Sequence, residues 1–141
     1  DYTDAIFTLS QIQAEEGNLK SAIASVEVAS VISPNDVGVF FQLGFLRYKN
    51  RDWQGAISAL ERAVELSSSY SNARYFLGLA YDKAGRTRDA INQFQTIQTL
   101  NPDNSEVRSI LSNLRAGRDP LGAEAPVQAP EKRTEPPIKD R

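Results

Sequence analysis

The stretch SNARYFLGLAYDKAGRTRDAINQFQTIQTLNP, residues 71–102, carries two apolar patterns of helical period on either side of a glycine. Leu77 and Tyr81 lie four residues apart, as do Ala90 and Phe94. Side chains at this spacing share one face of a helix, so each pair marks the buried stripe of an amphipathic helix. The stretch therefore predicts two consecutive helices rather than strands.

The turn and the end of this pair are marked by residues with restricted or unusual backbone preferences. Gly85 can adopt the left-handed conformation that ends a helix, and Asn50 is expected to do the same just before Arg51. Pro102 stops the second helix. The small Gly78 allows the two helices to approach closely, so the unit is predicted to be a helix–turn–helix hairpin.

The same pattern recurs every 34 residues. Repeats begin at residues 3, 37 and 71, with a partial fourth at 105. Many independent columns agree at this one spacing, which is the pattern of a repeat architecture. The columns include Ala22, Ala56 and Ala90; Leu9, Leu43, Leu77 and Leu111; and Gly17, Arg51 and Gly85. Helices are predicted near 3–16, 19–32, 37–49, 53–66, 71–84, 87–100 and 104–116.

These columns resemble the tetratricopeptide repeat family, whose signature is W-x2-L-G-x2-Y, then A-x3-F, then Pro. The third repeat matches best; the others depart at the Tyr and Pro columns, where Gln13, Arg47 and Ser68 stand. The resemblance covers about residues 3–117. It implies an all-α fold, a right-handed α-solenoid of three helix–turn–helix repeats (about 3–36, 37–70 and 71–104) and a C-terminal capping helix (about 104–116).

The last predicted helix has the pattern of an end cap. It has one apolar stripe and a polar remainder, so it can cover the last repeat and face water. The stripe consists of Val107, Ile110, Leu111 and Leu114. At the other end, Asp1–Ala5 parallels the repeat junction Ser69–Ala73, so we expect a C-terminal fragment of a longer protein.

Residues 118–141 differ in composition from the repeat domain, residues 1–117. They hold five of the seven prolines, many charges and no aromatic residue. Such a segment buries too little apolar surface to offset the entropy of ordering it, so a disordered tail is predicted. A linker role is the simplest reading. Tethering would also let the tail occupy the groove as a weak internal ligand, through Val127 or Ile138.

Composition argues against several functions. With 16 basic and 18 acidic residues, the net charge of −2 does not favour nucleic-acid binding. Without His or Cys the chain lacks the usual zinc ligands and the imidazole and thiol groups of common catalytic sites, so neither an enzyme, a metal site nor a cofactor is expected. No apolar run reaches the roughly 20 residues of a spanning helix, so direct membrane insertion is not expected.

The family resemblance implies that the first helix of each repeat lines a concave groove that binds a peptide or a helix. Residues 5, 9 and 12 of each repeat would face it, with lysines following. Several of these aromatics could instead pack between neighbouring repeats. The predicted groove residues are Phe7, Gln11, Phe41, Phe45, Tyr48, Lys49, Tyr75, Leu79, Asp82 and Lys83, with Ala14 also in register.

Some members of the family grip a C-terminal carboxylate with two Lys, an Arg and two Asn. The matching columns here carry no cation, so a charge-assisted grip of this kind is not expected. They hold Phe7, Gln11, Gln42, Asn72 and Phe76.

The function expected from the sequence is therefore a scaffold that binds a protein or peptide partner in an aromatic-lined groove. The alternative is a structural or assembly role as the soluble appendage of a larger bacterial protein, such as one that crosses the membrane several times. The partner would then be the rest of its own parent chain. The sequence leaves the compartment open, either cytoplasmic or attached to a membrane-protein parent.

Overall fold

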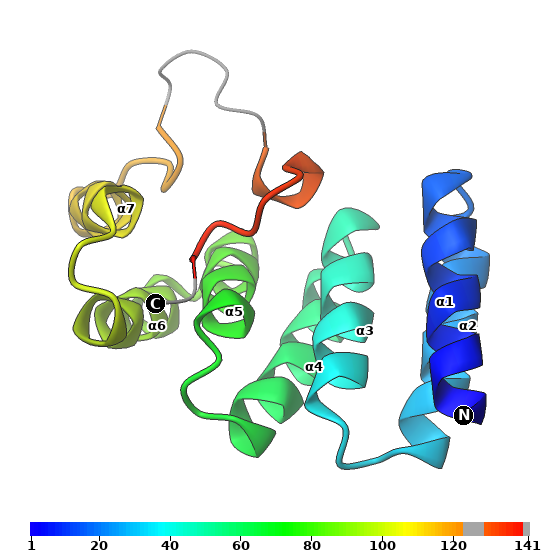
Figure 1. The fold of residues 1–141 in the computed structure, drawn as a ribbon. Coiled ribbons are helices and arrows are strands. Elements are labelled where there is room, and N and C mark those ends of the chain that lie inside the picture. Colours follow the sequence, from blue (N-terminus) through cyan, green and yellow to red (C-terminus); the bar gives the residue numbers. More distant parts are fainter. Residues whose placement is uncertain (123–128, 140–141) are drawn as a thin grey trace. The chain divides into compact units, whose positions relative to one another are not determined.

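The computed structural model describes residues 1–122 and 129–139. The chain divides into two compact units, Asp1–Ser68 (the first unit) and Ser69–Arg141 (the second unit). The described residues form an all-α helical-repeat fold (Figure 1). The first unit contains α1 (Tyr2–Glu15), α2 (Leu19–Ile32), α3 (Val37–Lys49) and α4 (Trp53–Leu66). The second contains α5 (Ser71–Lys83), α6 (Thr87–Leu100), α7 (Ser105–Arg115) and the short 3-10 helix η1 (Pro130–Lys132).

Five of the seven α-helices in the described residues begin at an Asp or Asn whose side chain accepts from a backbone N–H of the first turn. Asp52 accepts from the N–H of Gly55 at the start of α4, and Asn104 accepts from Val107 at the start of α7. Each such cap contributes about 1 kcal/mol. The seven predicted helices are all present, with ends displaced by at most one residue.

The first helix of every repeat ends in the same left-handed turn. Gly17, Arg51 and Gly85 occupy one repeat column and have φ of 82°, 60° and 78°. Each donates to the carbonyl three residues back, and the next residue donates five residues back, as Asp52 does to Arg47 at 2.9 Å. The expectation for Asn50 is wrong, because its φ is −81° and Arg51 takes the left-handed position. The repeat geometry therefore determines which position adopts the left-handed conformation, whichever residue type stands there.

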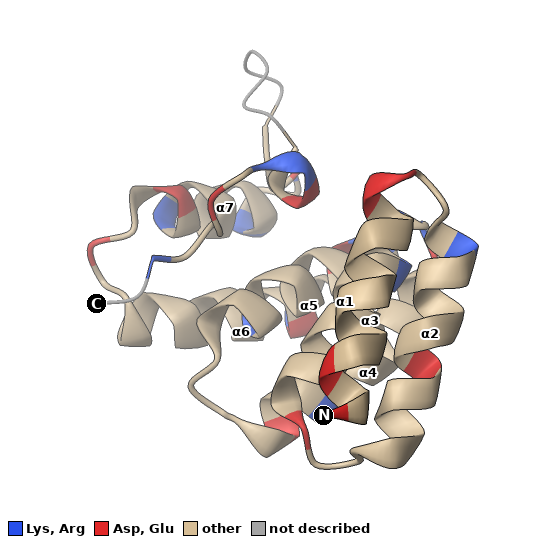
Figure 2. Cartoon of the chain, turned by 45° about the vertical axis from the view of Figure 1, so that its right-hand side comes forward, with Lys and Arg blue, Asp and Glu red and all other residues tan. Residues whose placement is uncertain are grey.

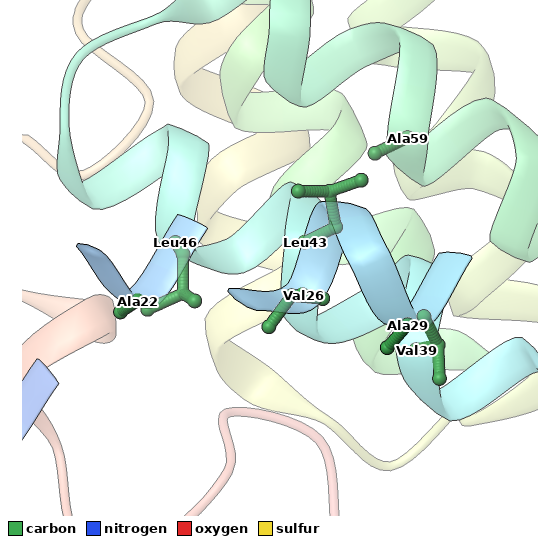
Figure 3. Packing of buried hydrophobic residues seen from close by; sticks show 7 residues of the cluster. All are labelled: Ala22, Val26, Ala29, Val39, Leu43, Leu46 and Ala59. Carbon is green, nitrogen blue, oxygen red and sulfur yellow. The ribbon is translucent and has the colours of Figure 1, made fainter. Parts of the chain in front are cut away.

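The core of the first unit lies between a stripe of small residues on α2 and larger aliphatics on α3 (Figure 3). The small stripe brings the α3 backbone close, and each fully buried aliphatic side chain contributes about 1.5–3 kcal/mol. The α4 helix adds Ala59 to the same cluster. Its buried members are Ala22, Val26, Ala29, Val39, Leu43, Leu46 and Ala59.

Glycine sets the distance between the two helices of a repeat. A Cβ at Gly78 would lie 2.5 Å from Cε2 of Phe94, and a Cβ at Gly44 would overlap the Leu60 side chain. Both partners are fully buried. The close approach expected from the sequence is therefore present in the second and third repeats.

The second unit is closed by α7. Its four predicted stripe residues are all buried, and the helix packs against α6. Most of its remaining side chains are exposed. In the second unit, α7 thus acts as the predicted cap.

We expect Gly78→Ala to destabilise the fold by up to about 2 kcal/mol. Overpacking against Phe94 costs about 1–3 kcal/mol, partly offset by the roughly 1 kcal/mol that alanine gains over glycine in a helix. Urea unfolding followed by circular dichroism measures the difference. The control is Gly38→Ala, where the new methyl would approach only the Asp36 side chain, at 3.2 Å. Equal stability of the two variants would contradict the close-packing explanation.

Candidate functional site

The α3 helix of the first unit presents a row of side chains from the predicted groove. Phe41 and Phe45 are half-buried, with ring centroids 6.1 Å apart and planes at 28°. One turn further on, the Lys49 ammonium lies 5.6 Å from the centroid of Phe45. On α1, Phe7 is half-buried and Gln11 is exposed. The α3 residues form an aromatic row with a cation at one end, which suits contact with apolar and π-bearing ligand groups.

Three predicted groove residues lie inside rather than on a surface. Tyr48 is buried and meets Trp53 edge-on, with centroids 5.2 Å apart. Tyr75 is 0% exposed and packs edge-on against Phe94 at 5.6 Å, and Leu79 is also buried. These positions differ from the expectation of exposed groove residues. The two tyrosine rings and the Leu79 side chain fill the interior, which is the alternative that the sequence pattern leaves open.

The remaining two predicted residues close α5. Lys83 is exposed, whereas Asp82 is half-buried. Burial raises the pKa of the Asp82 carboxyl, the negative charge of Asp119 raises it further, and Lys83 lowers it. The segment carrying Asp119 is held near α7, where Asn113 donates to the carbonyl of Pro120 at 3.1 Å. The negative charge of Asp119 therefore disfavours the ionised form of Asp82.

A second surface, on α5 and α7 of the second unit, holds residues 129–139, which we call the tail segment (Figure 1). The Asn72 amide pairs with the backbone of Ile138: Nδ2 donates to the carbonyl at 2.9 Å, and Oδ1 accepts from the N–H at 3.0 Å. Asn104 caps α7 with its oxygen and donates its Nδ2 to the carbonyl of Pro137 at 3.4 Å. Two asparagines thus hold consecutive residues of the tail segment by their backbone.

Charge anchors the other end of the tail segment. The Arg133 guanidinium makes a two-point contact with the Glu106 carboxylate, at 2.7 and 2.9 Å. Tyr75 donates its hydroxyl to the same carboxylate at 3.3 Å. The hydrogen bond to Glu106 is the main cause that raises the pKa of Arg133. Both signs of charge follow one another along η1 and the residues after it (Figure 2).

Apolar burial completes the contact. Ile138 is 3% exposed, and Pro130 is buried as well. A cavity of about 440 Å³ adjoins Ile138. Its lining is mostly polar and comes from Ser69, Tyr70, Ser71, Asn72, Leu100, Asn101 and Ile138.

In the described residues 129–139 of the predicted tail, side chains of α5 and α7 supply the partners that the composition of this segment lacks. Of the two residues expected to enter a groove, Ile138 is buried on this surface and Val127 lies outside the described residues. The sequence places Asn72 only in a column of the carboxylate clamp, and no local signal points to its partner 66 residues away.

The family model described as tetratricopeptide repeat matches residues 47–114. Together with the helical-repeat fold and its 34-residue columns, this match identifies tetratricopeptide repeats in the chain. The PEX5-related protein of Homo sapiens is 31% identical over 88 residues, which are 62% of this chain and 14% of that protein. The chain thus spans a small part of this relative.

Solved structures share the fold. The crystal structure of MamA superposes with a TM-score of 0.77 at 25% identity, over 82% of this chain and 67% of that one. The first TPR of Spaghetti (RPAP3), bound to the HSP90 peptide SRMEEVD, also has a TM-score of 0.77, at 17% identity, over 82% of this chain and 92% of that one. Among the described residues of the present chain, no helix is both long and apolar enough to cross a bilayer.

We expect Asp82→Asn to raise the melting temperature at pH 7. Because the folded state raises the pKa of this carboxyl, it binds the proton more tightly than the unfolded chain does, so ionisation of Asp82 destabilises the fold as pH rises through the raised pKa. Removing the charge removes that loss, and the gain should shrink as pH falls towards about 3, where the carboxyl is largely protonated in the unfolded chain as well. Thermal unfolding at several pH values tests this expectation.

The control is Asp89→Asn, because Asp89 forms an ion pair with Arg86 at 2.8 Å. That change should give no gain, or a loss of less than about 1 kcal/mol. A gain from Asp82→Asn that stays constant from pH 7 to pH 4 would contradict the electrostatic cause.

Proposed function

We propose that the chain is a non-catalytic interaction module that binds a protein partner through the first helices of its repeats. The observation that carries this proposal is the tail segment: a stretch of peptide lies on α5 and α7 and is held through its backbone by two asparagines. A surface that binds a peptide in this way has the chemistry needed to bind a partner. The peptide seen on the related first TPR of Spaghetti supports the same function.

The finer part of the proposal assigns the ligand anchors in the first unit. Phe41 and Phe45 offer half-buried rings on one face of α3, with Lys49 beside them. Aromatic side chains give large contact area at a low cost in conformational entropy, and they dominate the energy of many interfaces. Phe7 and Gln11 on α1 are the further proposed ligand-facing residues. In the second unit, Tyr75 and Leu79 support the surface from beneath, while Asp82 and Lys83 lie at the end of α5.

A carboxylate clamp is not part of this proposal. Of its matching positions, Phe76 is buried and Asn72 holds the backbone of Ile138. No cation stands at these columns, and a buried carboxylate without one would lose its hydration with little return.

A second candidate role, as a structural part of a larger chain, is favoured by one observation. Leu43 and Leu77 are buried, whereas Leu9 in the same repeat column is 48% exposed, and Val31 on α2 is 80% exposed. By the repeat geometry, the α1–α2 surface suits a helix with a stripe of small residues like that of α2. Charged substitutions at Leu9 and Val31 would then impair assembly of the parent protein and leave peptide binding unchanged.

The double variant Phe41→Ala, Phe45→Ala tests the proposed anchors. Peptides selected from a displayed random library on the whole chain should bind this variant at least about tenfold more weakly, because two aromatic anchors are lost. Fluorescence anisotropy measures the affinities. The control is Val31→Ala, an exposed position on α2 that should leave affinity unchanged. Equal binding by the double variant, with its helix content intact, would remove α3 from the binding surface.

The absence of a clamp has its own test. The peptide SRMEEVD should bind no more tightly with a free C-terminal carboxylate than as its C-terminal amide, because no lysine or arginine stands at the clamp columns. Isothermal titration of both forms gives the comparison. Tight binding of the free acid alone would show that another cation on the chain recognises the carboxylate.

A further inference from the structure

The Asn72 amide recognises a peptide in a way that does not depend on the side chain at that position. It pairs with both the N–H and the carbonyl of Ile138, as a neighbouring strand would. Every residue except proline offers these two groups, so the pairing positions a peptide without selecting its sequence. Selectivity must come from the side chains on either side of this contact.

Two side chains of the tail segment supply that selectivity. Ile138 is buried to 3% exposure, which favours an aliphatic residue. Five residues earlier, Arg133 forms its two-point contact with Glu106, which lies in the first turn of α7. A guanidinium matches the two oxygens of a carboxylate, whereas an ammonium can make only a point contact. The surface thus recognises an arginine and an aliphatic residue at a fixed separation.

The residues between these anchors favour the bound shape. Pro136 and Pro137 each have a fixed φ, and Glu135 before them is restricted to extended conformations. A segment restricted in this way loses less entropy when it binds. Asn104 uses the carbonyl of Pro137, a group that proline retains.

From this juxtaposition of Asn72, Glu106 and the tail segment, we propose that the α5–α7 face binds non-helical peptides of one pattern. In this pattern an arginine stands five residues before an aliphatic residue, and the aliphatic residue directly follows a proline. Residues 129–139 occupy the same face and compete with such a peptide. The inference rests on the proposed function and specifies its ligand and its regulation. The partner is a protein segment of the same pattern.

The competition follows from tethering. A segment joined to its own binding surface has an effective concentration of about the millimolar range, so a weak contact suffices to keep the surface largely occupied. A partner peptide must then displace the tail segment. If the segment alone binds with a dissociation constant of about 0.1 mM, occupation in cis weakens a competing ligand about tenfold.

The test uses the whole chain and a fluorescein-labelled peptide of residues 129–139, APEKRTEPPIK. In the tail-released variant Arg133→Ala, Ile138→Asp, the binding surface is unchanged while both anchors of the tail are removed. This variant should bind the peptide about tenfold more tightly than the wild-type chain does. Peptides with lysine at the Arg133 position, or alanine at the Ile138 position, should bind several-fold more weakly.

Within the tail-released variant, Asn72→Ala should lower peptide affinity by about tenfold because both backbone hydrogen bonds are lost. The matched control is Asn92→Ala, an exposed asparagine on α6 of the same unit. The proposal is overturned if the tail-released variant binds no more tightly than wild type, or if Asn72→Ala and Asn92→Ala bind alike. It is also overturned if a scrambled peptide of the same composition binds equally well.

Failure of this inference is distinguishable from failure of the proposed function. If library-selected peptides still bind and lose affinity in Phe41→Ala, Phe45→Ala while the tail peptide does not bind, the interaction function stands and the α5–α7 assignment falls. If neither kind of peptide binds the wild-type or the tail-released chain, the interaction function itself is excluded.

Discussion

The short distance between the two helices of each repeat is the constraint on which the structure depends. At Gly78 the α5 backbone leaves space for the ring of Phe94, and at Gly44 the α3 backbone does the same for Leu60. A repeat hairpin of about 30 residues is too small to bury a core of its own, so a wider separation would expose the apolar stripes that hold successive helices together. The left-handed turn after each first helix maintains this arrangement by reversing the chain within two residues, in all three repeats.

Close packing of the second helix leaves the first helix of each repeat with one face for another purpose. In the first unit, that face of α3 carries Phe41 and Phe45. In the second unit, the polar beginnings of α5 and α7 matter more. Asn104 is the N-cap of α7, a position where amide side chains are favoured, and Asn72 lies in the first turn of α5. Each has donors or acceptors that a partner's backbone can use. Residues that begin helices thus also supply the contacts of a binding surface.

The periodic columns were sufficient to predict the helices, the turns, the close approach at Gly78 and the capping role of α7, because these features depend on contacts within one repeat or between adjacent ones. The turn at Arg51 shows the limit of residue propensities. Propensity predicted the left-handed conformation at Asn50, but the repeat geometry places it at Arg51. The sequence could not decide whether Tyr48 and Tyr75 are buried or exposed, because an aromatic residue at a groove column can either pack in the core or contact a ligand. The contact between Asn72 and Ile138 joins residues 66 apart with no shared pattern, so no local signal could reveal it.

The composition that predicted disorder for residues 118–141 also explains why part of that stretch suits an exchangeable contact. Ile138 is among the few large aliphatics there, so its burial adds only about 1.5–3 kcal/mol, and the ordering of eleven residues works against it. The two-point contact of Arg133 and the backbone pairing of Asn72 orient the segment. They add only a modest free energy, because each replaces contacts with water. The segment is placed by the fixed φ of two prolines and anchored at both ends, but it is held weakly in total. It can therefore leave its surface without disturbing the helices beneath. Weak binding is therefore a consequence of the same sequence that specifies where the segment binds.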